Sequence, residues 1–98
     1  MNDGPAHSLI DAEVRRLRQL AYSGLARLVG AQQTKEVVGD DGRSYQLEIE
    51  AVWDGAKGGD IRVIVSAHDG GWRAFKPVTG DFIMRPDGSF AGESPGKR

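Results

Sequence analysis

Apolar residues recur at spacings of three and four through the first third of the chain. This stripe consists of Leu9, Ile10, Val14, Leu17, Ala21, Leu25 and Leu28. Because such spacing places side chains on one side of a helix, it predicts an amphipathic helix over residues 8–30. We expect Ser8 to cap its start and Gly30 to end it, since glycine takes the left-handed conformation at little cost. The polar residues 1–7 are expected to form a loose lead-in.

Beyond residue 34 the period of the apolar residues changes to two, which is typical of half-buried strands. Segments 35–39 and 43–53 flank Asp-Asp-Gly, a hairpin turn sequence. The alternation continues over residues 61–68. An antiparallel register that brings apolar residues opposite one another pairs Ile49 with Val65, Leu47 with Ala67 and Ala51 with Val63. A slip of one residue would undo this match, so the pattern favours an antiparallel pair.

The remaining segments complete the predicted sheet. Residues 72–78 are expected to form a fourth strand, which Pro77 ends or pushes to an edge. Residues 81–84 and 89–92 form a last hairpin around Arg-Pro-Asp-Gly, and 93–98 a frayed tail. The sequence therefore predicts a single α+β domain, with one long N-terminal helix packed on one face of a four- to five-stranded antiparallel meander spanning residues 35–92.

Composition removes several classes of function. The 98 residues include no cysteine, which excludes disulfides, a thiol nucleophile and cysteine-ligated metals. Thirteen basic and fourteen acidic residues give a formal net charge of -1, so no overall field attracts nucleic acid or an acidic membrane. The N-terminus lacks the basic start and apolar run of a signal peptide, and no apolar stretch approaches the roughly 20 residues of a membrane span. We expect a soluble cytoplasmic protein with no membrane partner.

Candidate chemistry is sparse. The two histidines, His7 and His68, have no second ligand at a spacing that zinc sites use, so we expect neither a metal nor a cofactor. The loop 54–60 contains glycines and a lysine, but it joins two strands instead of opening a helix, which argues against a phosphate site. Glu48 and Glu50 share one strand face, as a general acid–base pair would. An exposed polar face with Arg62 and Ser66 as neighbours explains them equally well.

Nucleic-acid binding can be tested against the predicted faces of the sheet. Proteins that bind single-stranded RNA on a sheet present aromatic rings on its open side. Here Tyr45 and Trp53 fall on the face that the helix is expected to cover. The other face carries no ring at the positions Gln46, Glu48, Glu50, Arg62, Ile64 and Ser66. We therefore do not expect nucleic acid as a partner.

The stretch from His68 to Lys76 combines turn residues with residues typical of interfaces. The sequence Asp69-Gly70-Gly71 is typical of a tight turn. Trp72 and Phe75 are separated by an odd number of positions, so strict alternation sends one of them outward unless a bulge changes the phase. An outward ring beside basic side chains suits an interface, since tryptophan and arginine are enriched in hot spots. Alternatively, Trp72 closes one end of the core.

Residues 58–93 carry three motifs, Gly-Gly-Asp-Ile-Arg-Val, Asp-Gly-Gly-Trp-Arg and Pro-Asp-Gly-Ser-Phe. This run resembles a family of small, uncharacterised bacterial domains. The resemblance implies a bacterial source and a free-standing or appended domain. It implies no catalytic residue, ligand or partner.

The leading hypothesis is a non-enzymatic protein-interaction module, an accessory, regulatory or toxin-neutralising partner, that binds another protein through the open sheet face and the 68–76 rim. Its candidate partner-binding residues are His68, Asp69, Trp72, Arg73, Phe75, Lys76, Glu48, Glu50, Arg62 and Ile64. A small-ligand domain with a pocket between helix and sheet, near Trp53, Asp54, Asp60 and Trp72, is the alternative. A third possibility is an enzyme that uses Glu48, Glu50 or the His68–Asp69 pair. A homodimer through the open face or through the first strand is also compatible with the sequence.

Overall fold

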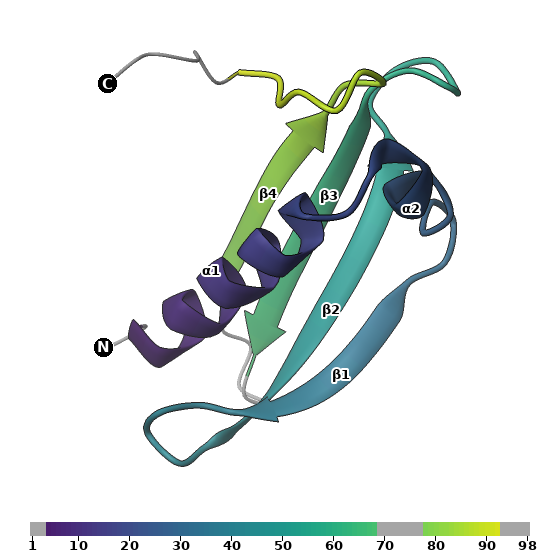
Figure 1. Ribbon diagram of the computed structural model, residues 1–98. Coiled ribbons are helices and arrows are strands. Elements are labelled where there is room, and N and C mark those ends of the chain that lie inside the picture. The colour runs from purple at the N-terminus through teal and green to yellow at the C-terminus, as the bar shows by residue number, and fades with distance from the viewer. Residues whose placement is uncertain (1–3, 69–77, 93–98) are drawn as a thin grey trace, which may run out of the picture.

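The computed structural model describes residues 4–68 and 78–92 of the chain. The elements, in chain order, are α1 (Gly4–Arg18), α2 (Tyr22–Ala26), β1 (Gln33–Val38), β2 (Ser44–Trp53), β3 (Ile61–His68) and β4 (Val78–Met84). The strands form one antiparallel sheet in the order β1-β2-β3-β4. In the described part of the chain, both helices lie on the same face of this sheet (Figure 1). The predicted α+β class, with a helix on an antiparallel meander, is confirmed.

The register of the central strands is the predicted one. Ile49 lies opposite Val65, and the pairing continues from Gln46 opposite His68 to Trp53 opposite Ile61. Every residue that the pattern assigned to the helix face of β3 is buried: Ile61, Val63, Val65 and Ala67. The β1–β2 turn passes through Gly42, whose φ of 79° is a conformation that glycine adopts without strain.

The N-terminal helix begins earlier than predicted. Gly4 and Pro5 already belong to α1, so residues 4–7 are not a loose lead-in, and Ser8 lies inside the helix instead of capping it. Proline fits the first turn of a helix because its missing N–H would have no partner there. Ala6 is already buried, so this first turn belongs to the part of α1 that packs on the sheet.

The predicted continuous helix over residues 8–30 is wrong at its C-terminal end. α1 ends at Arg18, the chain turns at Gln19 and Leu20, and Ala21 is extended with φ -71° and ψ 162° before α2 begins. A straight helix of that length would measure about 35 Å, whereas the eight residues of β3 span about 26 Å. The break allows Leu25, which is completely buried, to fold back over the sheet instead of passing beyond its end.

The core lies between the two layers. α1 packs on β3 and β4, and α2 packs on β3. The core side chains are Ala6, Ile10, Leu17, Leu25, Tyr45, Leu47, Ile49, Ala51, Ile61, Val63, Val65, Ala67, Phe82 and Met84. Tyr22 fixes α2 to the β2–β3 loop, because its hydroxyl donates a hydrogen bond of 2.7 Å to the Gly59 carbonyl. In the part of the chain that the structure describes, the helices therefore cover one side of the sheet and not the other.

β1 is an edge strand with little cover on either side (Figure 1). Val38, at its end, is 67% exposed. Lys35 of this strand contacts the helix layer, with its Nζ 2.8 Å from Glu13 Oε1. Glu13 is 5% exposed and also accepts a hydrogen bond of 3.1 Å from Arg16 Nε. Glu13 therefore forms ion pairs both with Arg16 of its own helix and with Lys35 of the sheet.

The C-terminal region of the sheet departs from the predicted last hairpin. Residues 81–84 belong to β4, which starts at Val78 directly after Pro77. Beyond the turn at residues 85–89, Phe90 makes a single antiparallel bridge to Met84 instead of a strand. Arg18 stacks over this region, with its guanidinium carbon 4.0 Å from the centre of the Phe90 ring. Apart from Val78, the fourth strand predicted over 72–78 lies outside the described residues.

Candidate functional site

The uncovered side of the sheet, which we call the open face, carries alternate side chains of all four strands. The strand register assigns to it Thr34, Glu36, Val38, Ser44, Gln46, Glu48, Glu50, Val52, Arg62, Ile64, Ser66, His68, Thr79, Asp81 and Ile83. Five predicted site residues therefore share this face: Glu48, Glu50, Arg62, Ile64 and His68. The other five, Asp69, Trp72, Arg73, Phe75 and Lys76, lie outside the described residues.

Arg62 is held by two carboxylates on the open face, near the end of the sheet that adjoins the β2–β3 loop. Its Nε donates to Asp54 Oδ1 at 3.3 Å, and its Nη1 donates to the carboxylate of Asp81. The hydrogen bonds that it donates to Asp54 and then to Asp81 raise the pKa of the guanidinium above its ordinary value. Ser66 lies directly opposite Glu48, as expected, whereas Arg62 lies opposite Val52 and forms its ion pairs outside the Glu48–Glu50 pair.

Three half-buried apolar side chains lie around this arginine. Val52 and Ile83 are the cross-strand neighbours of Arg62 on its two sides, and Ile64 is the next open-face residue along β3. The guanidinium therefore lies among apolar side chains that are still partly exposed to water. Apolar groups next to an immobilised arginine are a combination that binding hot spots use.

Glu48 and His68 meet diagonally across β2 and β3. Their closest atoms, Glu48 Oε2 and His68 Nε2, are 3.4 Å apart, and Gln32 Nε2 reaches Glu48 Oε1 at the same distance. Both separations exceed the 2.7–3.2 Å typical of a firm N–H···O hydrogen bond. Among the described residues, no hydrogen bond links the imidazole to Ser66. The alternation of the strands predicts that Glu48 and His68 share a face, but their diagonal contact follows only from the register of β2 and β3.

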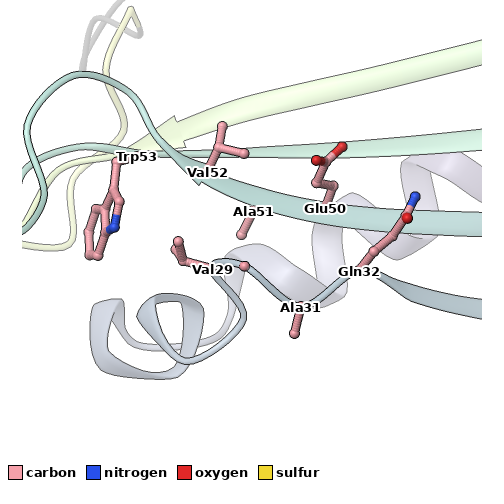
Figure 2. A pocket seen from close by; sticks show the side chains of 8 residues that line it. Val29, Ala31, Gln32, Glu50, Ala51, Val52 and Trp53 are labelled. Carbon is pink, nitrogen blue, oxygen red and sulfur yellow. The ribbon is translucent and has the colours of Figure 1, made fainter.

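A pocket of about 370 Å³ opens where β2 runs past the start of β1 (Figure 2). The register of β1 and β2 stops at the pair Gln33–Ile49, and beyond it the α2–β1 connector takes the place of β1. Gly30 N donates to the Ala51 carbonyl at 3.4 Å at this point. The pocket is lined by Val29, Gly30, Ala31, Gln32, Glu50, Ala51, Val52 and Trp53.

This pocket differs from the one that the sequence suggested. Trp53 does line it, but Asp54 and Asp60 do not, because Asp54 turns to Arg62 and its backbone N–H donates to the Asp60 carbonyl. The pocket lies between the connector and β2, not between a helix and the sheet. Trp72, the fourth residue of the predicted pocket, lies outside the described residues. Connector residues such as Gln32 carry no motif that would have marked them.

Charge is divided between the two sides of the sheet. Among the described strand residues, the open face has four carboxylates (Glu36, Glu48, Glu50 and Asp81) and one guanidinium, that of Arg62, a formal charge of -3 with His68 neutral. The helix layer and the helix side of β1 carry Arg15, Arg16, Arg18, Arg27 and Lys35 against Asp11 and Glu13. The near-neutral total thus conceals an acidic face and a basic face.

Metal ligation and membrane insertion can be examined over residues 4–68 and 78–92. No group of three or more His, Cys, Asp or Glu side chains is arranged there to hold a metal ion. None of the helices is long and apolar enough to cross a bilayer. Comparisons with protein families, with curated proteins and with solved structures find no match to this chain.

Proposed function

We propose that this chain is a non-enzymatic protein-interaction module that binds another protein through the open face. One observation carries the proposal: Arg62 is held by Asp54 and Asp81 between the apolar side chains of Val52 and Ile83. An arginine immobilised before binding loses little conformational freedom when a partner arrives. Its neighbours supply apolar area, and the two carboxylates already pair with the guanidinium, so burying Arg62 against a partner does not leave its positive charge unpaired.

The contacts of Glu48 and His68 favour binding over catalysis. General acid–base catalysis needs donors and acceptors within about 2.6–3.2 Å of the proton that moves, and an activated nucleophile needs a firm bond to its base. The Glu48–His68 contact is looser, at 3.4 Å, and stands on an open surface from which water is not excluded. Such a pair suits the polar rim of an interface.

A matched pair of substitutions tests the proposal. Ile64→Lys replaces the apolar side chain between Glu50 and Asp81 with a cation, and Ala12→Lys adds the same cation to an exposed position of α1. Tagged wild-type and variant proteins, each shown by circular dichroism to be folded, would be used for affinity capture from a bacterial lysate. We expect one protein to bind wild type and Ala12→Lys at near one-to-one stoichiometry and to be lost with Ile64→Lys. Equal recovery with Ile64→Lys, or no recovery with wild type, would overturn the proposal.

A further inference from the structure

The pocket beside β2 gives the edge of the open face a chemical preference. Glu50 and Val52 reach it from the open face, while Trp53 and Val29 line it from the other side of β2 (Figure 2). Of the described residues that line it, Glu50 alone is charged. Unlike Asp54 and Asp81, which pair with Arg62, Glu50 has no Lys, Arg or His nitrogen within 4 Å among the described residues. The pocket therefore offers a carboxylate without an ion-pair partner on the open-face side of β2, and apolar and aromatic surface on the other side of the strand.

Few groups match all three components of this lining. A carboxylate pairs with an ammonium or guanidinium group, and an indole ring attracts the same cations through its π face. The valines match an aliphatic stem of the kind that lysine and arginine lay along apolar surface. Resting on the proposed function, we infer that the partner presents a basic segment to the open face and that one of its Lys or Arg side chains enters the pocket between Glu50 and Trp53.

The charge of the whole face supports this occupant. A surface of formal charge -3 attracts a basic segment before contact, and the basic helix layer repels the same segment from the wrong side. A second copy of the chain would have to offer its helix layer. There, Arg16 is already bound to Glu13 and Arg18 to the Phe90 ring. Such a head-to-tail contact would build a ring or an open filament, and not the two-fold dimer that is the commonest assembly of identical chains. The charges thus favour a distinct partner.

The test uses Trp53 as its own reporter. Trp72→Phe leaves Trp53 as the only tryptophan of the full chain. The probe is a ten-residue peptide of glycine and serine with four arginines, and the matched control replaces each arginine by citrulline, which has the same shape without the charge. Heteronuclear NMR of the wild-type protein follows the Trp53 indole N–H in parallel, so the readout does not depend on the Trp72→Phe variant.

We expect the arginine peptide to shift Trp53 emission to saturation and the citrulline peptide to have no effect. Glu50→Gln should raise the Kd about fivefold, the upper range for an exposed ion pair, whereas Glu36→Gln, on the same face but away from the pocket, should change it less than about twofold. The same Kd for both peptides, or an unchanged Kd for Glu50→Gln, would overturn the inference. Equally tight binding of free arginine amide would assign the pocket to a small amine, and self-association in light scattering would assign the face to a second copy; either result overturns it.

Capture experiments separate this inference from the proposed function. A partner that is lost with Ile64→Lys but retained in full with Glu50→Gln would leave the open face as the binding site and refute the basic side chain in the pocket. A partner that is retained with both variants would refute the proposed function itself. Loss with both variants, together with the peptide response, would support both.

Discussion

Gly80 determines how closely α1 approaches the sheet. It lies in β4 opposite Val65, and a Cβ added to it would lie 2.8 Å from Ile10 Cγ2 and 3.9 Å from Val14 Cγ2. Ile10 is 2% exposed, and a β-branched side chain in a helix has one strongly preferred rotamer, so its methyl group cannot swing aside. The substitution Gly80→Ala must therefore push α1 away from the sheet or strain the core.

The size of the effect follows from two opposing contributions. One extra carbon forced into a packed core destabilises a protein by about 1–3 kcal/mol. Replacing glycine by alanine restricts the unfolded chain, which returns about 0.4–1 kcal/mol. We expect a net loss in the free energy of unfolding of about 1 kcal/mol, which lowers the Tm of a domain of this size by roughly 4–8 °C.

A double-mutant cycle measured by urea denaturation checks this reasoning. Ile10→Ala removes the Cγ2 methyl group and should destabilise by about 2–5 kcal/mol on its own. In that background Gly80→Ala should be neutral or stabilising, because the added methyl group now enters the space left by Ile10. Gly24→Ala is the matched control, since its added Cβ meets only Leu20 Cβ, at 3.6 Å, and should stabilise α2 by about 0.5–1 kcal/mol. If Gly80→Ala costs nothing in the wild-type background, or the same in both backgrounds, the close-approach argument is refuted.

Two further predictions concern contacts that hold the layers together. Burial alone raises the pKa of Glu13, but the hydrogen bonds and charges of Arg16 and Lys35 lower it by more, so its pKa in the folded state lies below the ordinary value of 4.5. The resulting stabilisation is complete above the unfolded pKa and is lost as pH falls through the folded one, so the urea midpoint of wild type should fall more steeply than that of Glu13→Gln below about pH 5; parallel curves would contradict this. Tyr22→Phe removes the hydroxyl that donates to Gly59 and should cost about 0.5–1.5 kcal/mol, also measured by urea denaturation. An unchanged midpoint would show that water replaces this bond at no cost.

The pairing of β2 with β3 could be predicted from the sequence. The alternation in both segments determines which residues share a face, and a symmetric loop between them then sets the register, with Ile49 opposite Val65. The helix break at residues 19–21 could not, because the apolar stripe continues unchanged through Ala21 and Leu25 and contains no information on the length of the sheet below. The spacing of apolar residues therefore predicts which face of a helix is buried. The residue at which the helix ends depends on the elements against which it packs.

The same distinction applies to the candidate site. Alternation alone places Glu48, Glu50 and Ile64 on one face. The carboxylates that hold Arg62 could not be identified from the sequence. Asp81 reaches Arg62 only because β4 pairs with β3, and the sequence pattern did not predict the register of these two strands. The pocket likewise depends on β1 starting at Gln33, three residues after the predicted helix end. Contacts between elements therefore required the structure.

The packing of the first helix on the last strand determines when the core can close. Each strand pairs with its neighbour in the sequence, so the hairpins can form as the chain leaves the ribosome. Ile10 and Val14, however, pack near Gly80, some seventy residues later in the sequence. Until β4 has been synthesised, the apolar stripe of α1 has only part of its binding surface, and the helix side of β3 lacks one neighbour. Nascent or truncated chains that stop before Val78 would expose this surface, and they are the species of this protein that chaperones would bind.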